Sequence, residues 1–418
     1  MSTTDNPGDP NLRTRQSSYS RIVAALRYPD FRVLWIATVP NQLGQCIQQV
    51  LLGWLVFEMT NSSGMVGVAF AVRSAPNLIV GFAAGSVTDR LDRRTIMRIS
   101  TWGMLLFSFV LALLLYDGRL TVWHLLLATF FMGTLQAFYM TSRQAYVYDV
   151  VGAGGVVNGI ALVFLAQLVG GIFGAFLAGW SIDWWGPGSS FMVMGISYAV
   201  GAFGLYGLRF RGESAPQPRE PMSQNLLNYF RELKTNRVML SLMISTTAAE
   251  VLGFSHQVML PVLAKDVLHV GPTGLGVLTA FRFMGGALGA AVLTAVGEVR
   301  HRGLLLLVVL VLIGAGQVLL SQSSVFWMAL LFVTFINVMA TATDILHQIL
   351  LQFSVPNQQR GRAMGSWIVG IGTAPVGQLE IGYLAAVTNA RLALLTNGIG
   401  LAVLAVILVL LLPRVRRL

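Results

Sequence analysis

The stretch Gly67-Val-Ala-Phe-Ala-Val-Arg73 recurs in the second half of the chain as Gly276-Val-Leu-Thr-Ala-Phe-Arg282. In each copy the arginine is followed sixteen residues later by an acid, Asp89 or Glu298. The two copies are offset by 209 residues, which is half of the 418-residue chain. This duplication predicts two parallel halves of like topology, with a solute site between them near the middle of a membrane.

The composition explains why such halves belong in a membrane. Of all residues, 55% are hydrophobic and only 11% are charged, whereas soluble domains carry about 25% charged residues. Apolar runs of about 20 residues are long enough to span a bilayer as helices, and they predict an all-α integral membrane protein with twelve transmembrane helices. The runs are Leu34–Phe57, Met65–Val87, Ile96–Tyr116, Val122–Met140, Val156–Trp180, Phe191–Leu208, Val238–Leu263, Leu275–Val296, Leu304–Leu320, Phe326–Phe353, Met364–Val387 and Leu392–Leu412.

These runs define the expected domain organisation. We expect a tail over residues 1–30, a six-helix half over 31–208, a linker over 209–237, a second half over 238–413 and a tail over 414–418. The apolar residues of the linker are spaced for a short interfacial helix; they are Leu226, Leu227, Phe230 and Leu233. No short apolar segment with a small-residue cleavage site precedes the first span, so we expect no removable signal peptide. The single cysteine, Cys46, can form no intrachain disulfide.

The basic residues predict the orientation. Of 28 lysines and arginines, 23 lie in the N-terminal tail, in loops after even-numbered helices or at the C-terminus, Arg143 after helix 4 among them. The opposite side has only Arg119, Lys265 and Arg391. This asymmetry predicts a multi-pass protein with both termini in the cytoplasm, and we expect it to lie in the bacterial plasma (inner) membrane. The net charge of +11 is then spread over short loops that face anionic lipid, which argues against a nucleic-acid partner.

The loop after the second predicted helix carries a family resemblance. Gly85-Ser-Val-Thr-Asp89-Arg90-Leu-Asp92-Arg93-Arg94 resembles the major facilitator signature Gly-x-x-x-Asp-Arg-x-Gly-Arg-Arg. Asp92 stands where glycine is usual, a form similar to the branch of the enterobactin exporter and the macrolide efflux proteins. Ser142-Arg143-Gln144-Ala145 and Gln359-Arg-Gly-Arg-Ala-Met-Gly365 also resemble that branch. The resemblance runs from about Asp30 to the end of the chain and implies a major facilitator transporter.

The same loop suggests a gate. An acid at the mouth of a helix can accept hydrogen bonds from a helix N-terminus in the other half. The resemblance implies that Asp89 docks near the start of helix 11 and stabilises the state closed to the cytoplasm. The alternative is that the arginines only anchor the topology. The expected gating residues are Asp89, Arg90, Arg93, Arg94 and Arg362.

Polar residues within the spans predict the solute site, because charges at a helix centre are costly and usually face a cavity or a partner. Four amide side chains of helix 1 share one helical face, and helices 7 and 10 carry similar stripes. In the fold that the chain resembles, helices 1, 4, 7 and 10 line the cavity. The alternative for the amides is helix packing. The expected substrate-binding residues are Asn41, Gln45, Gln48, Gln49, Gln136, Thr246, Glu250, Gln257, Asn337, Thr341, Asp344 and Gln348.

Three carboxylates are the expected proton-coupling residues: Glu250, Asp344 and Glu380. A carboxylate buried between two halves can bind a proton in one state and release it when counter-charge or water approaches. As an alternative, Glu250 and Asp344 form structural pairs with Arg282, His256 or His347. The charges assigned a structural or coupling role are Arg73, Arg282 and Glu298.

The chain has no phosphate-binding loop, nucleophile–base pair or metal-ligand pattern. We therefore expect no enzyme activity, no cofactor and no metal, and energy supplied by an ion gradient. The expected function is alternating-access, proton-coupled export of a small amphipathic compound by a monomeric multidrug-type or siderophore-type antiporter, with the lipid bilayer, the solute and protons as its partners. Helix 5 keeps small residues from Gly170 to Gly179 but lacks the proline common in exporters, so uptake or lysophospholipid flipping stays open. A non-transporting membrane receptor is the alternative from another class.

Overall fold

The computed structural model describes residues 23–80, 88, 91–211, 237–297, 301–353, 367 and 369–411. Within these ranges all regular secondary structure is helical, and seven helical segments are long and apolar enough to cross a membrane. The expectation of a helical membrane protein is therefore confirmed. The first 22 residues, the linker from 212 to 236 with its expected interfacial helix, and residues 412–418 lie outside the described residues.

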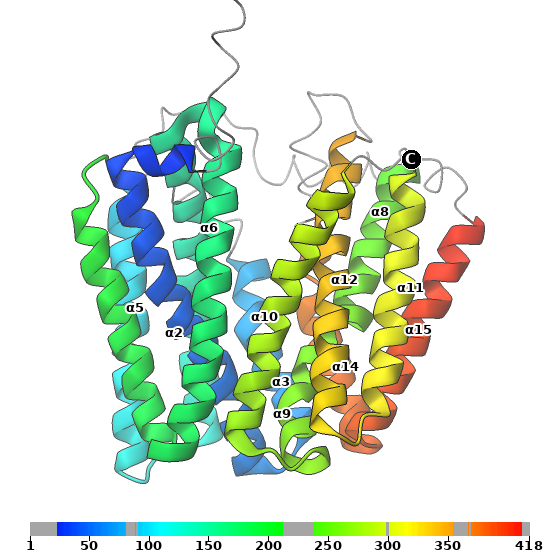
Figure 1. Cartoon of the computed structure of the whole chain (residues 1–418). Helices are drawn as coiled ribbons and strands as arrows, with labels where there is room; N and C mark the ends of the chain where they lie inside the picture. Colours follow the sequence, from blue (N-terminus) through cyan, green and yellow to red (C-terminus); the bar gives the residue numbers. More distant parts are fainter. Residues whose placement is uncertain are drawn as a thin grey trace, which may run out of the picture.

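The helices form two groups that stand side by side (Figure 1). The N-terminal group contains η2 (Ala24–Arg27), α2 (Pro29–Thr60), α3 (Ser63–Ile79), α5 (Arg93–Tyr116), α6 (Val122–Gly204) and η3 (Leu205–Gly207). The C-terminal group contains α8 (Arg237–Ala248), η4 (Ala249–Gly253), η5 (Phe254–Met259), α9 (Leu260–Val262), η6 (Leu263–Val267), α10 (Gly271–Val296), α11 (Arg302–Ser321), α12 (Phe326–Phe353), α14 (Ala374–Val387) and α15 (Ala390–Leu411).

Helix α6 is broken by two glycines and consists of three rods. Gly152 has φ 69° and Gly186 has φ 79°, values that favour glycine because it lacks a Cβ. The rods cover residues 122–151, 153–185 and 187–204. The expectation that Arg143 sits in a loop is wrong, because no glycine or proline interrupts the chain from Met140 to Val151 and the helix continues until Gly152 allows a turn. Arg143 is 2% exposed, and its guanidinium lies 5.5 Å from the centre of the Tyr139 ring.

The two groups touch where α2 ends at Thr60 and α3 begins at Ser63, which we term the seam end. The glycines that open the duplicated stretches make the contact. A Cβ built on Gly67 of α3 would lie 2.9 Å from the Cα of Gly382 in α14, and one built on Gly276 of α10 would lie 2.9 Å from the Cα of Gly179 in α6. A methyl group on either glycine would not fit, so the backbones of the two groups approach each other closely at these positions. The two positions are equivalent in the repeat.

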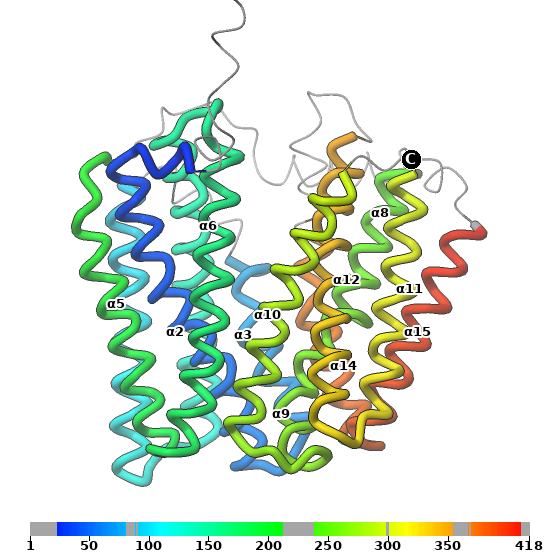
Figure 2. The backbone as a smooth tube through the Cα atoms, in the orientation of Figure 1, coloured from blue at the N-terminus to red at the C-terminus, as the bar shows by residue number. Residues whose placement is uncertain are grey.

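Polar and aromatic contacts reinforce this seam. Thr273 Oγ1 donates to Asp183 Oδ2 at 2.6 Å. The Lys265 ammonium lies 5.3 Å from the ring centre of Phe57 and 5.9 Å from that of Trp54. At the opposite end, where η3 finishes at Gly207 and α8 begins at Arg237, the backbones of the two groups diverge (Figure 2). We term this the linker end.

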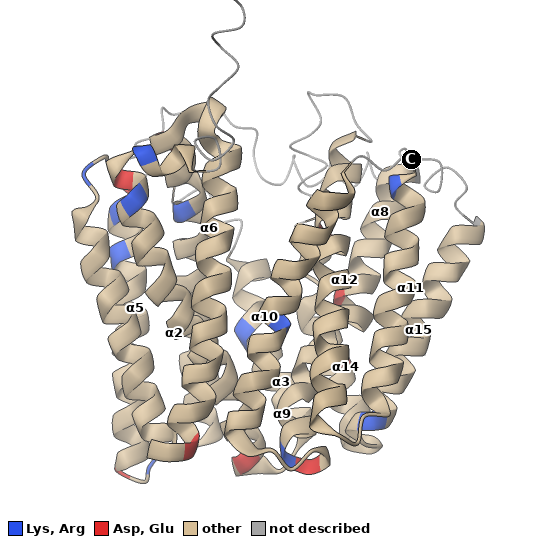
Figure 3. Cartoon of the chain, in the orientation of Figure 1, with Lys and Arg blue, Asp and Glu red and all other residues tan. Residues whose placement is uncertain are grey.

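The charged side chains are unevenly placed along this axis. Figure 3 shows most of the coloured Lys and Arg residues of the N-terminal group at the linker end, and most of the coloured acids at the seam end. A few charged residues lie between the two ends, inside the helical region (Figure 3). The candidate site lies among these interior charges.

Candidate transport site at the midplane

The amide stripe of α2 contacts both helix groups. Gln45 Nε2 donates to Gln136 Oε1 of α6 at 2.6 Å, and Gln48 Nε2 lies 3.4 Å from the Met132 sulfur. One turn after Gln45, Gln49 Nε2 donates to Gln257 Oε1 of η5 at 3.3 Å. The stripe therefore connects α2 to α6 within its own group and to the C-terminal group across the interface.

Arg282 of α10 completes this connection. Its guanidinium donates to the Oε1 atoms of Gln257 and Gln49, the latter at 3.3 Å, and lies 5.0 Å from the centre of the Phe283 ring. Both oxygen partners are neutral amides. The duplicated arginine of the second half thus reaches across to the first helix of the other group.

Arg73 of α3 is the repeat equivalent of Arg282. The positive charges of Arg73 and Arg282 act on each other, and both arginines lie near the buried Cys46. A Cβ on Gly133 of α6 would lie 2.7 Å from the Arg73 carbonyl oxygen, so α6 packs closely on α3 at this level. The two duplicated arginines therefore share one region between the helix groups.

Asn41, one turn before Gln45, makes contacts within the N-terminal group. It is fully buried, its Nδ2 donates to the Ala37 carbonyl at 2.9 Å, and its side chain packs against Gly201 of α6. The structure therefore places the Asn41 side chain at a contact between α2 and α6 inside the N-terminal group.

Glu250 lies where the seventh membrane segment loses regular α-helical form. Residues 249–253 make a π-helical turn and residues 254–259 continue as a 3-10 helix. Gln317 Nε2 of α11 donates to the freed carbonyls of Leu252 and Gly253 at 2.9 and 3.0 Å. Pro261 lacks an N–H and clashes with the carbonyl four residues earlier, which accounts for part of the irregularity. Such π turns often occur at functional sites.

Asp344 of α12 lies near enough to this break for its carboxylate charge to disfavour a charge on Glu250. Among the described residues neither acid forms an ion pair within 4 Å. His347, on the same helix, instead shares a 2.7 Å hydrogen bond with Ser245. Among the described residues, Glu250 and Asp344 therefore do not form the ion pairs with Arg282, His256 or His347 that the sequence analysis kept as an alternative.

The remaining expected site residues of the C-terminal group make helix contacts. His256 Nδ1 donates to the Gly253 carbonyl at 2.7 Å, which leaves its Nε2 to accept from Asn337 Nδ2 at 3.4 Å. Thr246 lies against Gly370, and Thr341 lies against Gly286. Gln348 is half-buried on α12.

Glu380 lies apart from the other two acids. Its Oε2 accepts from Asn397 Nδ2 of α15 at 2.9 Å, and the same amide donates to Ser255 at 3.3 Å. Glu380 therefore belongs to a contact between α14, α15 and η5.

Of the expected gating residues, Asp89, Arg90 and Arg362 lie outside the described residues, as does Glu298. Arg93 is 5% exposed and forms an ion pair with Asp149 of α6. Arg94 donates to Asp92 at 2.8 Å and to the Arg209 carbonyl at 2.7 Å. In this conformation both described arginines bind their own helix group.

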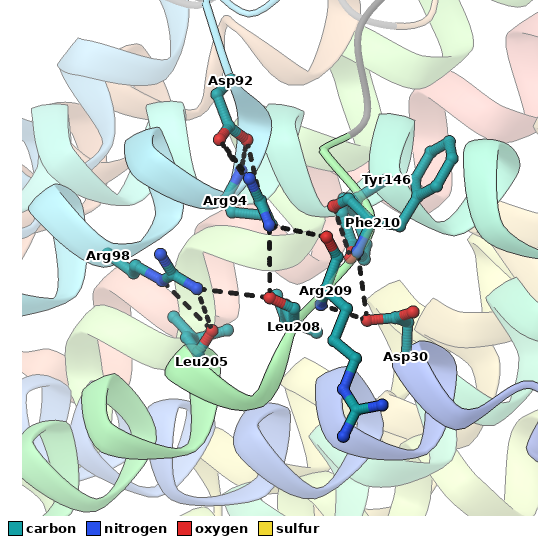
Figure 4. Close-up of polar contacts among 9 residues, drawn as sticks. All are labelled: Asp30, Asp92, Arg94, Arg98, Tyr146, Leu205, Leu208, Arg209 and Phe210. Atoms are coloured by element: carbon teal, nitrogen blue, oxygen red, sulfur yellow. Dashed lines mark hydrogen bonds and ion pairs between the residues drawn. The ribbon is translucent and has the colours of Figure 1, made fainter.

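These contacts extend into a polar cluster at the linker end (Figure 4). Arg98 Nη2 donates to the Leu205 carbonyl at 3.0 Å, and Tyr146 donates to the Phe210 carbonyl at 3.0 Å. The Asp30 carboxylate accepts from the Arg209 N–H at 2.5 Å. Side chains of α2, α5 and α6 thereby hold the last turn of the N-terminal group, where four carbonyls of any helix lack intrahelical partners.

Asp92, which departs from the usual glycine of the family signature, caps α5. Its Oδ1 accepts from the Arg94 N–H at 3.0 Å. Partial burial alone would raise the pKa of Asp92, but hydrogen bonds from the Arg94 side chain and backbone outweigh it and leave that pKa below its ordinary value. The substitution therefore supplies both a helix cap and a counter-charge.

Several contact residues escaped the sequence reasoning. Gln317 is a lone amide in an apolar helix and is fully buried, which is itself a signal because burying an amide is costly without a partner. Ser74 and Gln378 hydrogen-bond across the interface between α3 and α14. Tyr198 is fully buried with an unpartnered hydroxyl. Among the described residues, no group of three or more His, Cys, Asp or Glu could hold a metal ion.

The fold and the interior polar residues define a membrane transporter, and the comparisons specify the family. Residues 20–417 match the family model described as transmembrane secretion effector, and the chain belongs to this major facilitator family. Proteins with this fold and these relatives are transporters and not enzymes.

Two relatives are, by name, a transporter and an exporter of particular compounds. The chain is 22% identical over 355 residues to the staphyloferrin A transporter of Staphylococcus aureus (strain NCTC 8325 / PS 47), covering 81% of this chain and 85% of that protein. It is 22% identical over 401 residues to the enterobactin exporter of Shigella boydii serotype 4 (strain Sb227), covering 93% of each.

Solved transporter structures share the fold. The inward-facing, unoccupied bacterial homologue of the human lysosomal transporter Spinster matches with a TM-score of 0.72 at 13% identity, over 96% of this chain and 98% of that one. A POT family transporter in complex with a thioalcohol-conjugated peptide matches with a TM-score of 0.77 at 10% identity, over 92% and 96%.

Proposed function

We propose that this transporter exports a small amphipathic organic compound, of siderophore or drug-like type, in exchange for protons. The observation that carries the proposal is the interacting pair of Glu250 and Asp344, which has no ion-pair partner among the described residues. Burying a charge is costly unless it is paired, so a carboxylate in such a position is suited to binding and releasing a proton.

The proposal includes the topology. We infer twelve membrane crossings, with α6 supplying three rods and residues 238–267 supplying the seventh crossing. We also infer halves over 31–208 and 238–413, and both termini in the cytoplasm. The excess of basic residues at the linker end supports this orientation. In that frame the seam end faces outward, and the described conformation is closed to the outside.

Alternating access then requires the seam to part and the linker end to close. Asp89, Arg90 and Arg362 are proposed to meet at the linker end in the outward-open state, with Arg93 and Arg94 holding the base of the loop. The ion pair of Arg93 with Asp149 supports that role, because it anchors α5 beside the loop. The contacts of Gln49 and Arg282 with the opposite group would break during this motion.

The proposed solute site centres on the residues that face both groups. Gln45, Gln49, Gln136 and Gln257 supply hydrogen-bonding groups. Gln48, Thr246, Asn337, Thr341 and Gln348 remain proposed lining residues, and Asn41 is proposed to position α2 against α6. Glu380 is retained as a third proposed proton-coupling residue, acting through Asn397.

Export is supported by the relatives' names, since one of them is an enterobactin exporter. The test measures substrate-induced proton movement in everted vesicles, with macrolides, cationic dyes, catecholate siderophores and lysophospholipids as the panel. Wild type is compared with Glu250→Gln and Asp344→Asn. Asp117→Asn is the matched control, because Asp117 is an exposed acid at the end of α5.

We expect one substrate class to release protons from the vesicle lumen in wild type and the control. Either interior variant should abolish the release while substrate binding persists. Uptake in right-side-out vesicles, without any proton signal in everted ones, would replace export by import or lipid flipping. Tight binding without flux of any kind would instead support a receptor.

A further inference from the structure

The duplicated arginines raise a question that proton coupling does not answer. Arg73 and Arg282 carry positive charge in the interior of the molecule, one from each helix group, and they repel each other. Among the described residues, no carboxylate lies within 4 Å of either guanidinium. Both side chains are half-buried, and a charge that is partly withdrawn from water is costly unless it is paired, so a bound anion would stabilise this arrangement.

The hydrogen bonding of the two arginines also indicates that a negatively charged partner is missing. Arg282 is held only by the neutral amide oxygens of Gln257 and Gln49. Arg73 Nε is buried and has no hydrogen-bond partner. A guanidinium has five N–H donors and no acceptor, so what Arg73 lacks is an acceptor.

The neighbouring polar groups also lack acceptors. Gln136 uses its oxygen to accept from Gln45, while its Nε2 is buried without a partner. Gln136 lies one turn beyond Gly133, which packs on the Arg73 backbone. The buried Tyr198 hydroxyl interacts electrostatically with Arg73 and is likewise unpartnered. Three unmet donors, one from α3 and two from different rods of α6, therefore accompany the two cations.

The interior acids do not neutralise this region. The charge that acts on Glu250 is that of Asp344, whereas the charge that acts on Arg282 is that of Arg73. The carboxylates and the arginines thus form two separate electrostatic groups. One is suited to protons, and the other is suited to an anion.

We propose that Arg73 and Arg282 together bind the anionic group, a carboxylate or phosphate, of the transported solute. The guanidinium fork suits these planar or tetrahedral oxyanions. Because one arginine comes from each helix group, a bound anion would bridge the two groups and favour states in which they are close at this level. This inference rests on the proposed function and names the chemical class of its substrate.

The test is equilibrium binding to the purified full-length chain in lipid nanodiscs, with no pH gradient. The probes are citrate, succinate and inorganic phosphate as soluble anions, triethyl citrate as the neutral ester, and lysophosphatidylglycerol as an anionic lipid. We expect at least one anion to bind and triethyl citrate not to bind. Arg73→Gln and Arg282→Gln should each weaken anion binding at least tenfold, and Arg73→Lys should weaken it less.

Arg119→Gln is the matched control, because Arg119 is an exposed arginine between α5 and α6, and its anion affinity should equal that of wild type. If the arginine-to-glutamine variants do not fold, Gln136→Leu and Arg73→Lys take their place, with an expected loss of three- to tenfold. Arginine-dependent binding of the lysolipid alone supports the anion site and makes a lipid headgroup its source.

Equal binding of citrate and its ester, anion binding that survives the substitutions, or no binding of any anion would overturn the proposal. Since no gradient and no flux enter the measurement, a failure of proton coupling or of export leaves the expected binding unchanged. The two proposals can therefore fail independently.

Discussion

The two helix groups share a fold and a repeat but differ in the charges of their interior. The N-terminal group contributes Arg73 and the buried Arg143, and its other interior polar groups are mainly amides and hydroxyls. The C-terminal group contributes Glu250 and Asp344 together with Arg282. Among the described residues, carboxylates near the middle of the spans come only from the C-terminal group.

The first membrane segments of the two groups also differ, in how regular their helices are. Helix α2 remains α-helical over 32 residues although it contains Pro40. Its counterpart, residues 237–267, passes through π and 3-10 turns and depends on Gln317 for two carbonyl contacts. The comparison shows that the two groups are similar at the seam, where closely packed glycines make the contact. They differ in the interior, where each group carries different charged residues.

The largest expected effect comes from breaking the symmetric seam. Gly67→Val and Gly276→Val should each lower solute exchange in reconstituted liposomes at least tenfold, because the new side chain meets backbone that cannot rotate away. Gly154→Val is the control, since nothing lies within 4 Å of a Cβ there. Clearly unequal effects of the two repeat glycines would contradict a symmetric seam.

The next largest effect concerns the ion pair that anchors α5 in the N-terminal group. Arg93→Gln should lower the free energy of unfolding by about 3 kcal/mol, because it leaves a largely buried Asp149 carboxylate unpaired. Adding Asp149→Asn should recover part of that loss. Thermal unfolding in detergent measures both, and a double variant as unstable as the single one would argue against the pair.

A smaller effect is expected at the irregular helix of the C-terminal group. Gln317→Leu should cost about 1–3 kcal/mol, since it removes the donor for the carbonyls of Leu252 and Gly253. The exposed Gln322, at the end of the same helix, provides the control variant Gln322→Leu. Equal melting temperatures of the two variants would show that the helix 7 break needs no such support.

The smallest effect is a pH dependence at the linker end. Because the folded-state pKa of Asp92 is depressed, its stabilising contribution is present above the unfolded pKa of about 3.9 and is lost as pH falls through the folded value. At pH 7, Asp92→Asn should therefore lower the free energy of unfolding by under about 1 kcal/mol relative to wild type. Thermal unfolding at several pH values measures this difference. The difference should shrink toward pH 3, and a difference that grows on acidification would reverse the assignment.

The helical membrane fold could be read from hydropathy and the repeat, because spanning length and duplication leave few architectures. Helix boundaries were less predictable: Arg143 looks like a loop residue, yet the helix continues to Gly152. The glutamines 45 and 49 were recognisable as interior groups. Asn41 was not separable from them, because its packing against Gly201 depends on a contact between segments far apart in sequence.

The site was only partly readable for the same reason. An acid in a span predicts function, but its partner is set by tertiary packing, and nothing local shows that Glu250 faces Asp344 while Arg282 faces Gln49. Lone polar residues such as Gln317 and Tyr198 were the missed signal. Each is unusual in its apolar surroundings, and each lies at a contact that the hydropathy pattern cannot specify.

The glycine seam also bears on the origin of the chain. Gly67 and Gly276 occupy the same place in the duplicated stretch, so the surfaces that they form descend from one ancestral surface. A half-length precursor with that surface could pair with a second copy of itself about a two-fold axis, making both seams at once. Fusion of two such copies would make this pairing of separate chains an intramolecular contact. From then on each copy could acquire charges that would have been untenable if doubled.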